Sequence, residues 1–170
     1  LIDAAWCLVH FEQKDARAWK ALAYRIDNEL QVLSPAALAE VALAFASAQV
    51  RALEQGLAQR LVEVVTNLNA KDLKSLCSAV NAVPNFGGEL ELQLAEAVVK
   101  ALPRRAADLS SSGLGSVCTA VARWQSPPEA VQPLLSALAK SVGMLEPREV
   151  EAMLKALSKL GGHEVLRSCP

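Results

Sequence analysis

The sequence predicts an all-α protein, an α-solenoid of tandem two-helix repeats of about 38 residues. The first observation is an apolar residue that returns every 35 to 41 residues, at Leu1, Leu38, Leu73, Leu114 and Val150. The second is an apolar pair that recurs between them at matching intervals, at Leu22/Ile26, Leu57/Leu61, Leu94/Val98 and Leu134/Leu138. Two alternating helical patterns with one common period are typical of an array in which each unit packs on its neighbours.

Composition agrees with closely packed helices. Hydrophobic residues make up 52% of the chain, aromatic residues only 4%, and alanine and leucine dominate. Charged residues interrupt the longest apolar runs within a turn or two, so we expect no membrane insertion. With 17 basic and 18 acidic residues the formal net charge is −1, which does not attract a polyanion. Any nucleic-acid binding must therefore depend on a local patch.

Each unit pairs a first helix with a second helix, and we number its positions from the opening apolar residue as +0. First helices are expected at 1–11, 35–48, 70–83, 111–124 and 147–160, and second helices at 14–31, 50–67, 89–102 and 128–142. The units run approximately over 1–33, 34–68, 69–109, 110–145 and 146–170, the last being partial. We therefore expect the whole of 1–170 to be a segment of a longer repeat protein.

Local residues support these starts and breaks. Pro35 and Pro147 stand at the first position of their helices, Asn69 is suited to cap the helix that follows it, and residues 126–129 form a capping box. Residues 84–88 and 161–162 are breaks between a first and a second helix. Residues 103–108 are interpreted as a connector that lengthens the third unit. Pro133 lies about a turn inside a predicted helix and is expected to kink it or shift its start.

The recurrence also predicts the core. Position +3 is apolar and position +6 is small, because neighbouring helices are expected to approach closely there. Cys77 and Cys118 share position +4 and Cys7 occupies +6, so we interpret them as small buried residues and not as metal ligands or disulfide partners. We expect the following residues to be buried: Leu38, Val41, Ala44, Leu57, Leu61, Leu73, Leu76, Ala79, Leu94, Val98, Leu114, Val117, Ala120, Leu134 and Leu138.

From Leu109 to Gly162 the order of these signals resembles the octotricopeptide repeat, a helical pair of similar length. Its units resemble LxxLLWALAKLG followed by a PPPEW-like start of the second helix. The closest matches here are LKALSKLG from Leu154 to Gly161 and SPPEA from Ser126 to Ala130. AAWCLVHF near the start and LAEVALAFASAQ from Leu38 are similar to the same first helix. Related first helices occur in FAST-kinase-like and RAP-domain proteins.

The resemblance implies an organellar RNA-binding factor that stabilises, processes or helps translate transcripts. It implies the mitochondrion, with the chloroplast as the alternative, and some related proteins belong to the mitochondrial ribosome. Two features depart from the family pattern. Its first-helix tryptophan at +5 appears only as Trp6, and Ala130 replaces the tryptophan at the start of the second helix.

The sequence offers no catalytic or metal-binding pattern. His10 and His163 have no Cys, Asp or Glu partner at ligand spacing along a helix. Residues 110–115 are rich in serine and glycine but lack the spacing and the lysine of a phosphate-binding loop. Carboxylates are scattered beside lysine and arginine. We therefore expect neither an enzyme, nor a cofactor, nor a small-molecule substrate.

The remaining clue is one face of the first helices, because positions +1, +5 and +9 share a helix face. In the first two units this stripe is Ile2/Trp6/His10 and Ala39/Leu43/Ser47, and in the later units it carries hydroxyl and basic groups. These groups, an amide nearby and two arginines of the connector are candidates for contact with single-stranded RNA. The alternative is an ordinary solvated face or loop. The candidates are Lys74, Ser78, Asn81, Arg104, Arg105, Thr119, Arg123, Lys155 and Lys159.

The expected function is that of a non-enzymatic organellar RNA-associated protein that binds mRNA or rRNA. The alternative keeps the fold but makes the chain a structural protein–protein scaffold, or a subunit of a large assembly such as the mitochondrial ribosome. The family resemblance favours RNA. The near-neutral charge favours the scaffold, because binding to the phosphate backbone normally needs clustered lysine and arginine.

Overall fold

The computed structural model describes residues 1–50, 54–84, 86, 88–124, 131–141, 143 and 145–158, and all regular structure in these ranges is helical. The α-helices are α1 (Ile2–His10), α2 (Ala16–Glu29), α3 (Pro35–Ser47), α4 (Glu54–Val64), α5 (Ala70–Ala82), α6 (Glu91–Arg105), α7 (Ser111–Arg123), α8 (Val131–Ser141) and α9 (Pro147–Ser158). Short 3-10 turns follow α4, precede α6 and follow α6: η1 (Val65–Asn67), η2 (Gly88–Leu90) and η3 (Ala106–Asp108). The predicted helices are thus present.

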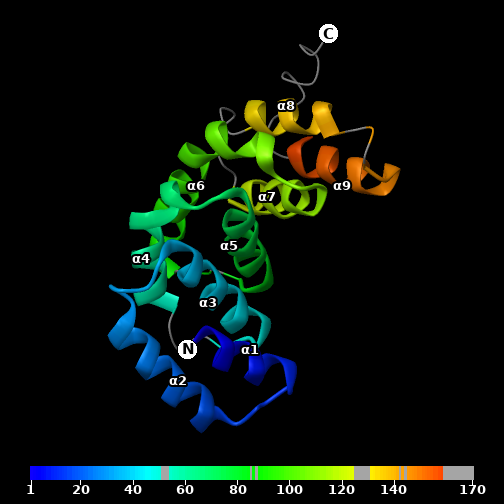
Figure 1. Ribbon diagram of the computed structural model, residues 1–170. Helices are drawn as coiled ribbons and strands as arrows, with labels where there is room; N and C mark the ends of the chain where they lie inside the picture. The colour runs from blue at the N-terminus through cyan, green and yellow to red at the C-terminus, as the bar shows by residue number, and fades with distance from the viewer. Residues whose placement is uncertain are drawn as a thin grey trace.

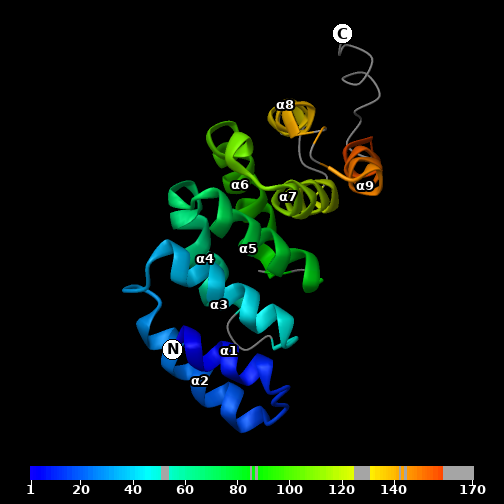
Figure 2. The ribbon, with the colours of Figure 1, turned by 45° about the vertical axis from the view of Figure 1, so that its right-hand side comes forward.

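Successive helices alternate between two rows (Figure 1). We call α1, α3, α5, α7 and α9 the inner helices, because each packs on the next along one side of the array. We call α2, α4, α6 and α8 the outer helices, and within their row α4 contacts α6 and α6 contacts α8. The array bends, and the inner helices lie along its concave side in both ribbon views (Figures 1 and 2). The inner row corresponds to the first helix of every predicted unit.

The recurrent apolar positions form the core, as the sequence predicts. All the residues expected to be buried are buried, and Leu138, at 4% exposed, is the most accessible of them. Ala44, Ala79 and Ala120, the small residues at +6, are fully buried in consecutive inner helices. In the first unit the outer helix is fixed by Trp19, whose ring packs edge-on against Phe45 at 5.1 Å between ring centroids. The core therefore runs continuously between the two rows.

The starts of the inner helices also agree with the sequence. Pro35 and Pro147 are the first residues of α3 and α9. The side chain of Asn69 accepts a hydrogen bond of 2.9 Å from the backbone N–H of Asp72, so Asn69 caps α5. The hydroxyls of Ser34 and Ser110 accept similar bonds at the starts of α3 and α7. The predicted capping box at 126–129 lies outside the described residues.

Two inner helices end in the same left-handed turn. Glu12 and Gln49 both stand at +11 and have φ angles of 48° and 57°. After α1 the N–H groups of Glu12 and Gln13 donate to the carbonyls of Val9 and Leu8, and the same pair of bonds closes α3 at Gln49 and Val50. This pattern is a Schellman motif, in which the residue with positive φ is usually glycine. Here two polar residues occupy the place of that glycine.

The prediction that residues 103–108 form a connector is wrong. Helix α6 continues through Pro103 to Arg105, and η3 carries the chain on to Asp108. Pro103 lacks a backbone N–H to donate within the helix, but Leu102, Ala106 and Leu109 are buried and hold this stretch against the core. Pro133 lies near the beginning of the described part of α8, whose predicted start falls in residues outside the described ranges.

The prediction that the cysteines are buried is confirmed for Cys77 and Cys118 and is wrong for Cys7. Cys77 and Cys118 are buried, and desolvation raises the pKa of each thiol to about 12, so neither is a nucleophile at neutral pH. Cys7 is exposed, together with Ala4 on the same face of α1. The neighbouring inner helix α3 packs on the other side of α1. In the described chain no helix covers the side on which Cys7 lies.

Candidate functional site: the inner helices

The predicted RNA contacts are divided between the two rows. Ser78 and Lys74 lie half-buried on α5, whereas Thr119 on α7 and Lys155 on α9 are exposed. Arg104 and Arg105 lie in the last turn of α6, so they belong to the outer helices and not to a connector. The structure thus separates the arginine pair from the inner stripe. Lys159 lies outside the described residues.

Polar side chains join neighbouring inner helices to one another. The indole N–H of Trp6 donates to Oε2 of Glu40 at 3.3 Å, and the hydroxyl of Ser75 lies 3.5 Å from Oε1 of the same carboxylate. One carboxylate thus connects α1, α3 and α5. We call these three residues, together with Ser78, Asn81 and Ser116 between α5 and α7, the polar seam.

The second part of the polar seam uses the same register. The hydroxyl of Ser78 donates to the hydroxyl of Ser116 at 3.1 Å, and the side-chain amide of Asn81 donates to the carbonyl oxygen of Ser116 at 2.9 Å. Trp6 and Ser78 both stand at +5, and Glu40 and Ser116 both stand at +2. Ser78 and Asn81, predicted to contact RNA, therefore form hydrogen bonds within the array.

The residues at +2 were missed by the sequence analysis, although they left a signal. This position is polar in four successive units, as Asp3, Glu40, Ser75 and Ser116. A polar residue recurring on an otherwise apolar helix face indicates a partner on the neighbouring helix. The stripe at +1, +5 and +9 was defined within a single helix. It therefore left out the residues of the neighbouring helix to which its members form hydrogen bonds.

Arg123 also has partners within the protein. Its guanidinium donates to the carbonyl oxygen of Val80 and lies 3.3 Å from Oε1 of Glu91. The indole N–H of Trp124 donates to the same carboxylate oxygen at 3.2 Å. The side chains of Arg123 and Glu91 are 28% and 22% exposed, so the pair is partly shielded from water. This cluster connects the ends of α5 and α7 to the beginning of α6.

A buried carboxylate lies beside the polar seam. Asp72 in the first turn of α5 is only 6% exposed. Burial raises its pKa above the usual value of 3.8, and the nearby charge of Glu40 acts in the same direction, whereas Lys71 and a hydrogen bond from Asn69 oppose the rise. The negative charge of Asp72 is therefore costly in the folded chain.

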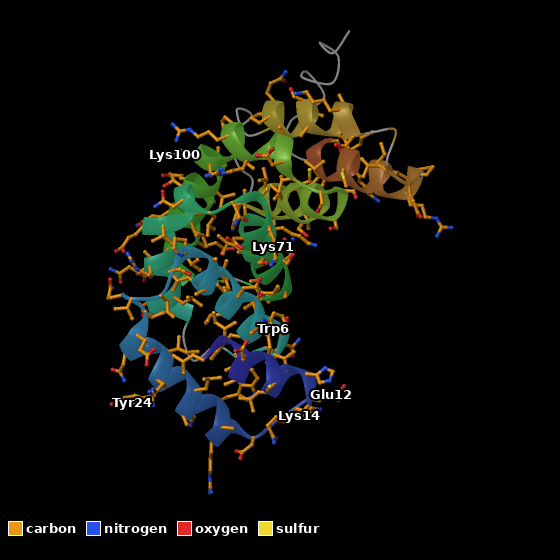
Figure 3. All side chains as sticks on the ribbon, viewed as in Figure 1. Trp6, Glu12, Lys14, Tyr24, Lys71 and Lys100 are labelled. Carbon is orange, nitrogen blue, oxygen red and sulfur yellow. The ribbon has the colours of Figure 1, made fainter. Side chains whose placement is uncertain are left out.

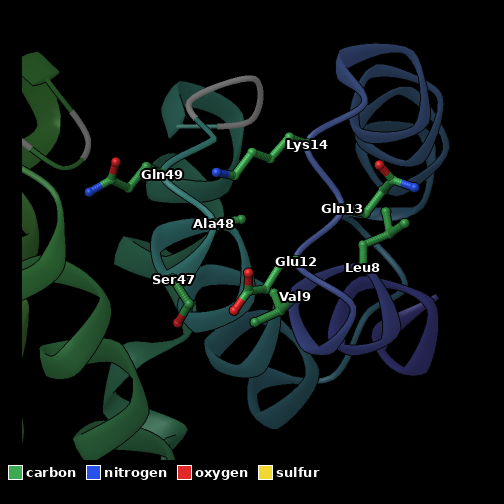
Figure 4. Close-up of a pocket in the computed structure, with 8 residues that line it drawn as sticks. All are labelled: Leu8, Val9, Glu12, Gln13, Lys14, Ser47, Ala48 and Gln49. Atoms are coloured by element: carbon green, nitrogen blue, oxygen red, sulfur yellow. The ribbon is translucent and has the colours of Figure 1, made fainter.

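Two open hollows lie beside the ends of inner helices. The first, of about 260 Å³, has an apolar floor of Leu8, Val9 and Ala48 between α1 and α3. Figure 4 shows Glu12 and Lys14 extending from the turn after α1 toward the end of α3. The second, of about 500 Å³, is bounded by the Glu91–Arg123 cluster. Each hollow mixes acidic and basic groups, so neither favours a ligand of one charge.

Within the part of the chain that the structure describes, no cluster of three or more His, Cys, Asp and Glu side chains is placed to bind a metal ion. Over the same residues no helix combines the length and the apolar character that a bilayer crossing requires.

No family model, curated protein or solved structure matches this chain. The relation to the octotricopeptide repeat thus remains a resemblance carried by the residues quoted from the sequence.

Proposed function

We propose that the chain is a segment of an α-solenoid of two-helix repeats of about 38 residues, and that it binds RNA through its inner helices. Support for the repeat comes from the alternation of inner and outer helices and from polar contacts that recur between +5 of one inner helix and +2 of the next. In this proposal the chain is non-enzymatic and acts in an organelle, the mitochondrion or alternatively the chloroplast.

The observation that carries the RNA proposal is the uneven distribution of cations along the inner row. Helix α1 has no lysine or arginine, nor does α3, whereas α5 carries Lys71 and Lys74 and α9 carries Arg148 and Lys155. Lys71, Arg148 and Lys155 are exposed and Lys74 is half-buried; Figure 3 labels Lys71. These side chains are suited to phosphate contacts, and the exposed hydroxyl of Thr119 lies on α7 between them in the row.

A protein–protein scaffold is the second candidate, and a specific observation favours it. Two members of the stripe, Ser78 and Arg123, and the nearby Asn81 have hydrogen-bond partners in neighbouring helices. With a formal net charge of −1, the remaining lysines provide only a small local attraction for RNA. In this alternative the chain is a structural subunit of a large organellar assembly such as the mitochondrial ribosome.

A salt titration of RNA binding distinguishes the two. Replacing Lys71, Lys74 and Lys155 together with Ala should weaken binding to single-stranded RNA. It should also reduce the slope of log affinity against log salt by about 2, since each lost phosphate contact removes about 0.7. Thermal melting should change little, because Lys71 and Lys155 are exposed and Lys74 is only half-buried.

The matched control replaces three exposed lysines of the outer helices, Lys20, Lys100 and Lys140, with Ala. It changes the net charge equally and should leave both affinity and slope close to those of the unmodified chain. Equal losses in the two triple variants would indicate non-specific attraction. Unchanged binding in the inner variant would reject the RNA-binding face and leave the scaffold as the better account.

A further inference from the structure

The outward face of α2 carries a basic and aromatic stripe. Arg17, Lys20 and Tyr24 are three and four residues apart, so their side chains share one face of the helix. All three are exposed, Tyr24 at 74%, and Trp19 and Ile26 are buried on the opposite face. Figure 3 labels Tyr24 beside α2, on the side away from α1. We call Arg17, Lys20 and Tyr24 the α2 stripe.

The two cations of the α2 stripe are not neutralised by the protein. Among the described residues neither has an ion-pair partner, whereas Arg25 on one flank of the helix is paired with Glu29 at 3.3 Å. The remaining carboxylate of α2, Asp27, lies on the other flank beside Gly56 of α4. The stripe therefore presents two positive charges and one exposed ring, with no acidic side chain between them.

The face that holds the α2 stripe stays open in a longer array. Counted from the apolar pair of each outer helix, Lys20 and Tyr24 correspond to Leu92 and Glu96 of α6. Both are exposed, Leu92 at 67%, although α6 packs on α4 before it and on α8 after it. These positions thus face away from the neighbouring outer helices. Units added at either end would leave the stripe accessible.

The charge belongs to α2 and is not a general property of the repeat. The same two positions are Gln55 and Gln59 in α4 and Gln132 and Ser136 in α8, and all four side chains are exposed and neutral. Arginine and tyrosine are enriched where proteins bind one another, and an exposed tyrosine offers a rigid apolar ring with a polar tip. The outer row therefore has, at α2, a surface suited to a partner of opposite charge.

We propose that the α2 stripe binds an acidic segment of a partner protein. Carboxylates of the segment pair with Arg17 and Lys20, about one helical turn apart, and an apolar side chain packs on the ring of Tyr24. RNA is the less suitable occupant, because a phosphate at every nucleotide is normally met by a longer row of cations. The inference goes beyond RNA binding by the inner helices and does not depend on it.

Titration of the isotope-labelled chain with an acidic peptide, followed by amide NMR, tests the proposal. The probe is a synthetic peptide of four Glu-Glu-Leu-Ala repeats, and the control peptide has Gln in place of every Glu. The acidic peptide should shift the amide signals of α2 in a saturable manner, with a dissociation constant below about 1 mM. The neutral peptide should not. Absence of saturable shifts in α2, or shifts centred on another helix, would overturn the proposal.

Substitutions then test the individual contacts. Replacing Arg17 and Lys20 together with Ala should weaken binding of the acidic peptide at least about fivefold, since two exposed ion pairs are lost. Tyr24→Ala should also weaken it, whereas Tyr24→Phe keeps the ring and should bind like the unmodified chain. The matched control replaces Lys100 and Arg104 of α6, both exposed, with Ala and changes the net charge equally. It should leave binding unchanged, and equal weakening in this control would make net charge the cause and overturn the proposal.

Single-stranded oligouridylate distinguishes an acidic protein from RNA as the occupant. The proposal expects it to leave the amide signals of α2 unchanged at concentrations at which the acidic peptide saturates them. Oligouridylate shifts in α2 that are lost when Arg17 and Lys20 are replaced would make the stripe an RNA contact and overturn the proposal. Circular dichroism of each variant establishes that the helices are intact, so that weaker binding reports the side chains and not unfolding.

Discussion

The guanidinium of Arg123 lies 3.3 Å from Oε1 of Glu91, and this pair joins the end of α7 to the beginning of α6. A cation that the sequence placed on an RNA-binding stripe is therefore held by the protein itself. The relationship matters for stability, because Glu91 is partly buried and also accepts the indole N–H of Trp124.

We first predict that Arg123→Ala destabilises the chain by about 1.5–3 kcal/mol, since it removes hydrogen bonds to a carboxylate and to the carbonyl of Val80. Urea denaturation followed by circular dichroism measures the effect. Lys155→Ala is the control and should change the free energy of unfolding by no more than about 0.5 kcal/mol, because Lys155 is exposed. Equal small effects in both variants would contradict the structural role of Arg123.

The second prediction concerns the small residues between inner helices. Ala79→Leu and Ala120→Leu each add a branched side chain at a fully buried position and should cost about 1–3 kcal/mol by overpacking. Ala82→Leu, an exposed site one turn along α5 from Ala79, is the control and should be nearly neutral. Wild-type stability in both buried variants would show that close approach of the helices is not what requires alanine at +6.

The third prediction uses the left-handed residues. Gln49 has a φ of 57°, which a residue with a Cβ adopts at a cost, so Gln49→Gly should stabilise the chain by about 0.5–1 kcal/mol. Gln59→Gly, the same substitution at an exposed position inside α4, should instead destabilise it by about 1 kcal/mol. Thermal or urea melts measure both changes in stability. Because the two substitutions are expected to change stability in opposite directions, a general effect of glycine cannot account for both results.

The fourth prediction follows from Asp72. Burial raises its pKa above 3.8, so the folded chain holds this proton more tightly than the unfolded chain. Its contribution to stability is therefore fully present below about pH 3.8 and is lost as the pH rises through the raised pKa. Asp72→Asn does not ionise, so its stability relative to the unmodified chain should improve as the pH rises through that window.

Urea melts at a series of pH values measure this difference. Asp108→Asn, at an exposed position in η3, is the control and should show a difference that does not follow the same trend. A stability difference between Asp72→Asn and the unmodified chain that stays constant with pH would contradict the raised pKa.

The helices and their core were accessible from sequence because they depend on local, periodic information. Leu38, Leu73 and Leu114 recur at intervals of 35 and 41 residues, and each is fully buried at the equivalent place of α3, α5 and α7. The cap at Asn69 was readable for the same reason, since a cap bonds a residue only three positions away. The local sequence pattern was thus sufficient to predict those contacts that repeat from unit to unit or lie within one helical turn.

Contacts between units were harder to predict. Arg123 on α7 meets Val80 on α5 and Glu91 at the beginning of α6 because these three helix ends lie together in the fold, and no periodicity encodes this. Pro103 suggested a break, but burial of its neighbours outweighed the loss of one backbone donor. Exposure of Cys7 depends on what covers α1, which the repeat pattern by itself does not specify.

The arrangement of the inner row has a consequence for how the chain opens. Helices α3, α5 and α7 each pack on the helix before and the helix after them in the row, and the contact between α3 and α5 is the most extensive. Opening one end therefore breaks a single contact in that row, whereas opening the middle breaks two. Amide hydrogen exchange should be slowest in α3 and α5 and fastest in α1 and α9, so the chain should lose its structure stepwise from the ends inward.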